Sequence, residues 1–541
     1  MQTPIDPSGS DRRALHGRVV TMDGSFNVLD RGTVYVEGGI IIAVKRDGEP
    51  PPPGFETVKG ITTRGTIYPG LIELHNHLSY NVLPLWQVPK RYDNRDQWSG
   101  TPTYQKLISG PMKVLGMTPG YIEAVVRYVE CKCLLGGVTT SQGIALFSNQ
   151  GIMRYYRGIV RNVEQTEEAD LPEATAKIGD VEAADASKFL ARLQRSSCML
   201  LHLSEGVDRK SREHFNALNL PSGEWAVTSA LSGIHCVALQ PQDFGILADK
   251  RASMVWSPLS NILLYGKTAD VKAANNEGVR IGLGSDWSST GSKNLFGELK
   301  VARLVNLEDG AVFSDRDLMA MATRNAAEIL KWDKVIGSIE AGKRADLLVV
   351  SGANGDPYGK FLEAPETSIH LVMINGVPRF GTKTLMSKLG SGTESWRVDS
   401  TDRMLNLKQP TADPVVGALK LGDAKVKLAD GLRRLPELAS QLERPQGDSR
   451  GTDFFSGPPQ WFLMLDHEDP PGIAQRLYLG ADLGGARAVR GVDTSSVQLS
   501  QLLEPLSLDP LTVADDPTYL DRLSQQPNLS DFVRENLRGM Y

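Results

Sequence analysis

Short apolar runs alternate with longer amphipathic stretches between residues 68 and 338. Runs such as "CMLLHLSEG", "GIHCVAL", "SMVWSPLS" and "RIGLGSDW" have the length and composition of buried strands. Strand-then-helix repetition predicts a parallel sheet, and polar residues stand where each apolar run stops. We therefore expect an α/β fold with a (β/α)₈ TIM-like barrel over residues 68–338, whose active-site rim lies at the carboxyl ends of the strands.

The two segments that flank this region have a different pattern, with short β-rich runs and tight turns. Gly38-Gly39 separates two such runs before the barrel, and Asn375-Gly376 is a strong two-residue turn after it. We expect a small β-sandwich domain built from both flanks, residues 1–67 and 339–385.

The last part of the chain, residues 386–541, is rich in Pro and Gly and is interrupted by helical segments. The segments "DAKVKLADGLRRLPELASQL" and "YLDRLSQQPNLSDFVRENLRGMY" have helical patterns. We expect a mixed helix and loop C-terminal extension that packs on the barrel.

Composition narrows the class of protein without naming a function. The 541 residues are 41% hydrophobic and 23% charged, which is ordinary for a globular protein with a large core. A net charge of −5 predicts no nucleic-acid partner, and the chain has no apolar run long enough to cross a membrane. The first residues do not resemble a secretory signal, so a cytoplasmic location is expected.

Four cysteines are too few for a disulfide framework in a chain of this length. Cys131 and Cys133 could bind a metal, but no C-x-x-C partner exists elsewhere and they lie in a helix-like segment. Buried structural thiols are the favoured interpretation of this pair.

Histidine is scarce, and its distribution carries the chemistry. Of eight histidines, His75, His77, His202 and His235 fall at the ends of predicted strands. Side chains at i and i+2 of a strand share a face, so His75 and His77 can point at one ion. An H-x-H pair alone is a weak motif, and structural histidines explain it equally well.

Later residues strengthen the metal hypothesis. Glu205 follows His202 by three positions, and i and i+3 of a regular strand face opposite sides. Glu205 therefore reaches the same site only if the strand ends near Ser204 and the chain curls, which Gly206 permits. Asp286, at the end of "IGLGSDW", could ligate a metal or hold a water.

The order H-x-H, H-x-x-E, H, then S-D resembles the amidohydrolase superfamily, and most of all its branch of cytosine deaminase, adenosylhomocysteine deaminase and triazine hydrolases. "YPGLIELHNH", "SPLSNILLYG" and "ATRNAAEILKWDKVIGSIEAGKRADLLVV" also resemble family segments. The resemblance covers roughly residues 14–383. It implies a metal-dependent hydrolase that cleaves a C–N bond of a small molecule with a metal-activated water, either by deamination of a cyclic amidine or by cleavage of an amide-like bond. It also implies a homo-oligomer, expected to be a dimer.

The same resemblance assigns roles to residues. It implies that His75, His77, His202 and Asp286 bind one divalent metal, zinc first and Fe(II) as the alternative. It implies that Glu205 shuttles protons, and that His235, with Asp286, orients the attacking water. Binuclear members need a lysine on the fourth strand, which we expect at residues 158–166. That segment has no lysine, and Lys177 is expected in a solvated loop or helix, so one metal is predicted.

Substrate contacts are harder to predict. Trp86, Trp256, Asn261 and Tyr265 are candidate substrate-binding residues, as are Tyr92 and Trp98, although packing explains the aromatic residues equally well. Val255-Trp256-Ser257-Pro258 and the loop after the first strand depart from the nearest relatives, which weakens the case for a nucleobase substrate. A non-catalytic binding or scaffolding protein on a retained barrel is the alternative.

Overall fold

Eight short parallel strands form the centre of the computed structural model, which describes residues 11–409, 413–443, 460–465 and 498–541. A three-stranded sheet has the order β5-β6-β9, and a five-stranded sheet has the order β10-β11-β12-β13-β14. The strands are β5 (Leu71–Ile72), β6 (Val138–Ser141), β9 (Arg161–Asn162), β10 (Ala174–Lys177), β11 (Cys198–Leu203), β12 (Leu231–His235), β13 (Ser253–Trp256) and β14 (Arg280–Leu283). The fold is therefore α/β and TIM-barrel-like.

Backbone hydrogen bonds join the two parallel sheets at both of their edges. The amide of Ala174 donates to Val163 O at 2.8 Å, next to β9, and the amide of Leu74 donates to Leu283 O at 3.3 Å. An isolated parallel bridge pairs Asn76 with Asp286. The carboxyl ends of β5 and β14, which carry candidate site residues, thus lie side by side.

Alternate residues of β11 face two different cores. Leu200 packs with Ile72, Ile234 and Val255 in an inner cluster between the strands. Leu201 belongs to the larger cluster that the surrounding helices share. Both faces are apolar, which explains why this strand reads as a continuous hydrophobic run rather than an alternating one.

The fourth strand corrects the sequence prediction. Residues 158–166 contain the third parallel strand, β9, whereas β10 is the strand that pairs with β11. Lys177 is the last residue of β10, and not part of a loop or helix. Small alanines and a length of four residues gave β10 little strand signal in the sequence.

Lys177 nevertheless points away from the inner cluster. It lies opposite Leu201, which faces the helices, whereas Ala176 lies opposite Leu200, which faces inward. The ammonium group of Lys177 donates to the carbonyl oxygens of Gly179 and Asp180, the latter at 3.1 Å.

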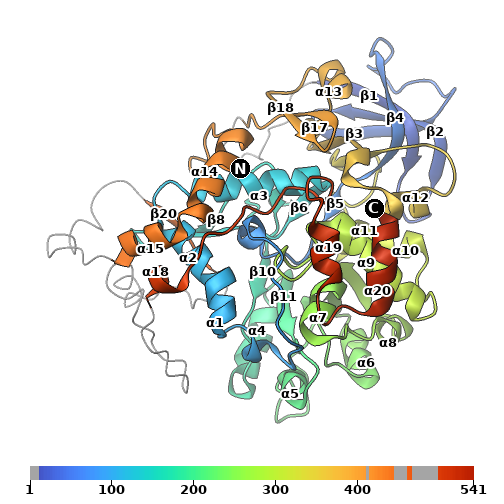
Figure 1. Ribbon diagram of the computed structural model, residues 1–541. Coiled ribbons are helices and arrows are strands. Elements are labelled where there is room, and N and C mark those ends of the chain that lie inside the picture. The colour runs from blue at the N-terminus through green and yellow to red at the C-terminus, as the bar shows by residue number, and fades with distance from the viewer. Residues whose placement is uncertain (1–10, 410–412, 444–459, 466–497) are drawn as a thin grey trace.

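A nine-stranded sheet combines both flanks of the chain, as Figure 1 shows at the upper right. Its order is β18-β19-β17-β16-β15-β4-β1-β2-β3. The bounds are β1 (Arg12–Val20), β2 (Val28–Glu37), β3 (Ile40–Arg46), β4 (Gly60–Pro69), β15 (Leu347–Ser351), β16 (Ile369–Ile374), β17 (Val377–Thr382), β18 (Glu394–Val398) and β19 (Thr401–Leu405). The sheet continues past residue 385, because β19 pairs with β17.

The two predicted turns are present, and they lie against each other. Gly38-Gly39 joins β2 to β3 and Asn375-Gly376 joins β16 to β17, and all four residues have positive φ. A Cβ on Gly39 would lie 2.7 Å from Asn375 O. Glycine at this position is therefore required by both the backbone conformation and the close approach.

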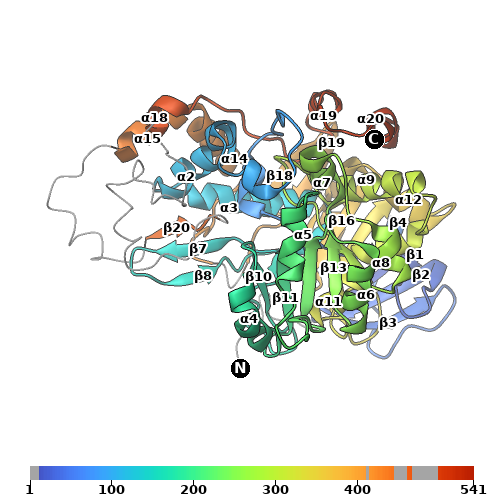
Figure 2. The same cartoon turned by 90° about the horizontal axis from the view of Figure 1, so that it is seen from below.

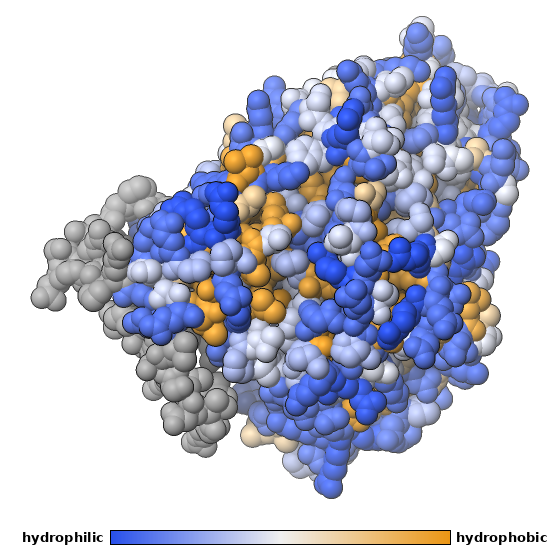
Figure 3. Space-filling view, in the orientation of Figure 1, coloured by the Kyte–Doolittle hydropathy of each residue, from blue (hydrophilic) through white to orange (hydrophobic). Residues whose placement is uncertain are grey.

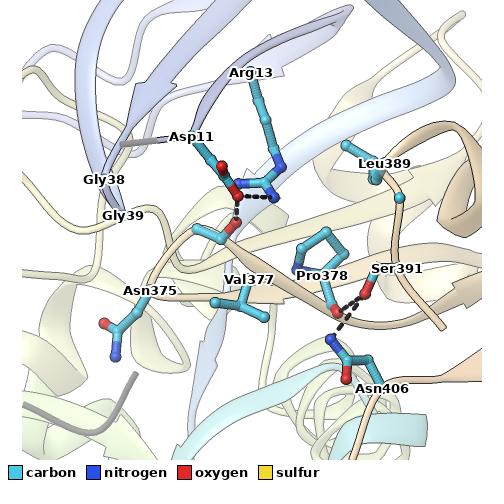
Figure 4. Close-up of a pocket in the computed structure, with 12 residues that line it drawn as sticks. Asp11, Arg13, Gly38, Gly39, Asn375, Val377, Pro378, Leu389, Ser391 and Asn406 are labelled. Atoms are coloured by element: carbon cyan, nitrogen blue, oxygen red, sulfur yellow. Dashed lines mark hydrogen bonds and ion pairs between the residues drawn. The ribbon is translucent and has the colours of Figure 1, made fainter. Parts of the chain in front are cut away.

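A polar cavity of about 230 Å³ opens beside these turns (Figure 4). Arg13 and Asp11 form an ion pair at one side of it, and Asn406 donates to Ser391 at the other. The cavity belongs to the nine-stranded sheet and contains none of the candidate site residues.

Helices cover the outer face of the parallel strands. Those nearest the site are α3 (Ile122–Leu135), α5 (Arg209–Asn216), α7 (Pro258–Tyr265) and α9 (Leu295–Glu308). On the face in Figure 3 hydrophilic side chains predominate, with apolar side chains in scattered patches. No helix within the described residues is both long and apolar enough to cross a bilayer.

The C-terminal extension is helical where it was predicted to be. Within its described residues from 413 onward, the α-helices are α14 (Leu421–Arg433), α15 (Leu435–Glu443), α18 (Leu499–Leu502), α19 (Tyr519–Ser524) and α20 (Asp531–Asn536). Figure 1 shows the chain after α18 crossing the molecule in extended form to α19 and α20, and Figure 2 places these elements on one face. We call residues 503–541 the strap.

Candidate metal centre

His75 and His77 lie just beyond β5, in a stretch that the bridge to β14 keeps extended. The amide of His77 donates to Asp286 O at 2.6 Å, and the amide of Asp286 donates to His75 O at 3.0 Å. The ring centroids of His75 and His77 are 4.9 Å apart. Their backbone is therefore locked to the residue that completes the predicted ligand set.

The curl predicted after His202 is present. Strand β11 ends at Leu203, Ser204 has φ +52°, and Gly206 has φ +143°. The carboxylate of Glu205 consequently lies with the ring nitrogens of His202 and His235, and these ligand atoms are all within 4.8 Å of one another. Left-handed backbone at a serine is strained, and such strain gathers at functional sites.

His235 and Asp286 also have left-handed backbone, with φ +68° and +65°. In the alternation of β12, Ile234 faces the inner cluster, so a regular strand would turn His235 outward. The left-handed conformation ends the strand and turns the imidazole toward His75, with ring centroids 5.0 Å apart.

Four side chains converge as the sequence predicted. Asp286 Oδ1 lies 3.1 Å from His75 Nε2 and 3.3 Å from His77 Nε2. His202 Nε2 lies 3.3 Å from His77 Nε2. Three nitrogens and one carboxylate oxygen thus surround a common point, a donor set that suits zinc or Fe(II).

Two of these atoms are buried without a hydrogen-bond partner among the described residues, namely His75 Nε2 and Asp286 Oδ1. Buried polar atoms are nearly always satisfied, since leaving one unpaired costs about 1–3 kcal/mol. A cation between them would satisfy both, so the residues present fit a metal ion.

Neighbouring groups orient the candidate ligands. His75 Nδ1 lies 3.1 Å from Gln142 Oε1, which also accepts the amide of Asn76 at 2.9 Å. Because Oε1 can only accept, the proton of His75 is on Nδ1 and its Nε2 is free to bind a metal. On the other side, the Ser260 hydroxyl donates to Asp286 Oδ2.

Burial and neighbouring charges shift the pKa values of His202 and Asp286. Burial lowers the pKa of His202 well below its usual value, and the neighbouring His75 lowers it further. Burial by itself raises the pKa of Asp286, but the nearby histidines outweigh it and hold that pKa below its usual range. At neutral pH the site therefore contains a neutral imidazole and a carboxylate, the forms that bind metals.

Glu205 has partners on both oxygens. The Tyr265 hydroxyl donates to Oε1 at 2.6 Å, and Arg95 Nη1 lies 3.4 Å from Oε2. His235 Nε2 is 3.8 Å from the same oxygen, and its Nδ1 lies 2.8 Å from Asn261 Oδ1. Asn261 and Tyr265, both on α7, thus contact the centre through His235 and Glu205.

The predicted aromatic residues are buried, with different surroundings. Trp98 Nε1 donates to Tyr265 OH at 3.0 Å, which connects it to Glu205. Trp256 Nε1 donates to Thr268 Oγ1 at 2.7 Å, on the outer side of β13. Trp86 packs on Tyr104, with ring centroids 6.0 Å apart, and Tyr92 donates its amide to Leu264 O.

Some neighbours were missed by the sequence analysis. Gln142 and Arg95 belong to none of the quoted motifs, and Ser260, on α7, stands in "SPLSNILLYG" without a predicted role. Arg95 comes from the loop after the first strand and also pairs with Asp180 at 3.0 Å. Trp287, directly after Asp286, lies against His77 with ring centroids 5.4 Å apart.

Described histidines and cysteines outside the centre have structural surroundings, as predicted for Cys131 and Cys133. His16 contacts Thr33 at 2.6 Å, His214 pairs with Asp180 at 3.0 Å, and His370 contacts Thr63 O at 3.2 Å. His467 lies outside the described residues. All four cysteines are free and buried, and burial raises the pKa of Cys131 and Cys133.

Comparison with known proteins identifies similar families. Residues 210–379 match the model of the amidohydrolase family. Over 386 residues the chain is 25% identical to the 5-methylthioadenosine/S-adenosylhomocysteine deaminase of Symbiobacterium thermophilum, which covers 62% of this chain and 84% of that protein. The corresponding deaminase of Moorella thermoacetica is 26% identical over 52% of this chain and 72% of its own length.

Solved structures show the same fold. An atrazine chlorohydrolase variant from Arthrobacter aurescens, complexed with zinc and atraton, matches with a TM-score of 0.54 at 21% identity, over 68% of this chain and 94% of that one. A zinc-bound adenosine deaminase from Xanthomonas campestris matches with a TM-score of 0.51 at 17% identity, over 80% and 100%. By these comparisons the chain is similar to proteins of the amidohydrolase superfamily.

Proposed function

We propose that this protein is a metal-dependent hydrolase that cleaves a C–N bond in a small molecule. The observation that carries the proposal is the convergence of His75, His77, His202 and Asp286. Two buried ligand atoms in this set lack a hydrogen-bond partner among the described residues. Such an arrangement is costly in a protein that only binds partners, which speaks against the scaffolding alternative.

The four side chains would hold one divalent metal, zinc in the first place and Fe(II) as the alternative. Zinc is favoured because relatives of the same fold contain it. A single ion is favoured because Lys177, at the end of the fourth strand, faces away from the inner cluster. When bound, the metal supplies Lewis acidity for the attack of water on an sp² carbon.

The remaining residues would manage protons and orientation. Glu205, whose carboxylate lies beside His202 and His235, takes the proton from the attacking water and delivers it to the leaving nitrogen. His235, fixed by Asn261 at 2.8 Å, directs its Nε2 toward the reacting carbon or its substituent. Tyr265 and Arg95 keep Glu205 turned toward the centre.

Two classes of substrate remain candidates. The curated relatives are named as deaminases of 5-methylthioadenosine and S-adenosylhomocysteine, which favours an aminated heterocycle. Cleavage of an amide-like bond is the second class. Trp86, Trp256, Asn261 and Tyr265 are the proposed substrate-side residues, of which Asn261 and Tyr265 have the more direct contact with the centre.

Several broader features belong to the same proposal. The eight parallel strands would close into a (β/α)₈ barrel of residues 68–338. Residues 1–67 and 339–385 would form a small β-sandwich domain, which β18 and β19 of the C-terminal extension enlarge. The protein would act in the cytoplasm as a dimer, without a nucleic-acid or membrane partner.

Metal analysis combined with a substrate screen tests the proposal. The purified protein should contain about one equivalent of zinc or iron per chain, a stoichiometry typical of such four-ligand sites. 5-Methylthioadenosine, S-adenosylhomocysteine, cyclic ureas and amides are then assayed for released ammonia or amine. A protein that binds no divalent metal after reconstitution would refute the proposed centre.

A further inference from the structure

The geometry points to the strap as a positioning element of the centre, with Gln526 as its key residue. We infer that Gln526 fixes the loop after the first strand, residues 78–101, over the metal site. The contacts that support this inference are independent of the identity of the substrate.

The loop itself joins the ends of three strands. The amide of Trp86 donates to Ser289 O at 2.7 Å, after β14, and the amide of Tyr92 donates to Leu264 O at 2.9 Å, in α7. The amide of Val207, after β11, donates to Asp93 O at 2.7 Å. The loop also supplies Arg95 and Trp98, the residues that reach Glu205 and Tyr265.

Between these anchors, the middle of the loop depends on the strap. The Val88 amide donates to Gln526 Oε1 at 3.1 Å, and Gln526 Nε2 donates to Trp86 O at 2.8 Å. The side chain of Gln526 is fully buried, so both bonds are shielded from water. One amide thus satisfies a backbone donor and a backbone acceptor two residues apart.

Residues 526–528 of the strap also bind α7, on the other side of the site. Asn528 Nδ2 donates to Leu263 O at 2.8 Å in α7, the helix that carries Asn261 and Tyr265. Residues 526–528 therefore tie the loop to α7, and both of these elements contact Glu205 or His235.

A buried charge cluster fixes the strap a second time. Asp509 accepts from Lys132 at 2.6 Å and from Lys293 at 2.5 Å, and all three side chains are at most 2% exposed. A buried ion set of this kind is costly to break, because one removed partner leaves the others uncompensated.

Lys132 also links the cluster to the histidine pair. It donates to Asn81 O at 2.9 Å, and Asn81 Nδ2 donates to Asn76 Oδ1 at 2.8 Å. Asn76 lies between His75 and His77. The strap thus supports both the loop and the backbone that carries two candidate ligands.

Gln526→Met tests the inference, because methionine keeps the volume and removes both hydrogen bonds without burying a charge. Gln525→Met is the matched control, since that side chain is exposed and one residue away. Hydrogen exchange of the purified full-length protein is followed at the Val88 amide. We expect exchange there to accelerate about tenfold or more over the control. Equal protection of Val88 in the two folded variants would overturn the inference.

Asn528→Leu is the second variant, in case Gln526→Met does not fold. Its side chain is only half-buried, and its loss should raise exchange in the loop and in α7 by about tenfold. Unchanged exchange in both elements would count against the strap.

A kinetic measurement separates positioning from general stability, and it alone rests on the proposed function. With 5-methylthioadenosine, or the substrate that the screen identifies, Gln526→Met should raise KM about tenfold and change kcat less than twofold. A parallel fall in kcat at unchanged KM contradicts the inference. Failure of the hydrolase proposal would appear instead as no turnover by the parent protein, with the exchange result intact.

Discussion

Replacement of Glu205 by glutamine removes the proposed proton carrier while preserving the shape of the site. Glu205 is 7% exposed, and its two carboxylate oxygens face Tyr265 and Arg95. Glutamine is isosteric and can still accept the Tyr265 hydroxyl bond. Arg95 keeps its ion pair with Asp180 at 3.0 Å. The substitution should therefore change the chemistry and leave the fold intact.

The expected loss follows from the role of the carboxylate. General acid–base catalysis by a positioned side chain contributes about 10²–10⁴-fold. His235 lies 3.8 Å from Glu205 and offers a weaker route, because Asn261 holds its other nitrogen. We expect kcat to fall about 10³-fold, which corresponds to about 4 kcal/mol in the activation free energy.

Steady-state release of ammonia or amine, together with metal content, measures this prediction. Tyr265→Phe is the comparison, since it removes one hydrogen bond to the Glu205 carboxylate. The activation free energy should rise by about 1.5–3 kcal/mol, so kcat should fall roughly 10- to 100-fold. Both variants should retain the metal of the parent protein. A Glu205→Gln enzyme within threefold of the parent rate, with its metal in place, would remove Glu205 from the mechanism.

Three further predictions concern the metal and the stability of the fold. Ser260→Ala removes the hydroxyl that donates to Asp286, so zinc affinity should fall about 10- to 100-fold in a chelator competition, and an unchanged affinity would contradict the proposed support. Lys177→Met should leave the number of bound metal ions per chain unchanged, whereas the loss of one metal ion per chain would show that Lys177 is a ligand. Burial lowers the pKa of Lys300 to about 8 from 10.5, so the unfolded state binds more protons between these values and stability rises with pH across that window. The rise in unfolding free energy between pH 8 and pH 10 should be about 2 kcal/mol, and Lys300→Met should abolish it, as measured by urea unfolding at these two pH values. An equal rise in parent and variant would exclude Lys300 as its source.

The clustering of the candidate metal ligands could be predicted because their sequence spacings are recognisable. Histidine is scarce, the H-x-H and H-x-x-E spacings are short, and each group follows an apolar run. The curl at Ser204 could be inferred, since Glu205 cannot otherwise share a face with His202. The turn at Asn375-Gly376 was equally readable, because few residue pairs adopt two consecutive positive φ values.

Other features were invisible because they depend on distant contacts. Nothing local marks Gln142, whose partner is 67 positions away. Ser260 stands in a recognisable segment, but the sequence does not show that its hydroxyl contacts Asp286, 26 positions away. From the sequence alone Arg95 resembles a solvated surface residue, and only the folded loop brings it to Glu205, just after β11. Strand β10 was missed because alanine is a weak strand former, and its position depends on pairing with β11 rather than on its own sequence.

The nine-stranded sheet imposes an order on biosynthesis. Strands β1 to β4 leave the ribosome first, yet the free edge of β4 finds its partner β15 only after the whole parallel-stranded region has been made. In the interval, the nascent chain presents an unpaired strand edge, which is a template for misassociation. Pairing across so many intervening residues is also slow. Fragments that end before residue 347 should therefore aggregate, because they keep this edge of β4 exposed.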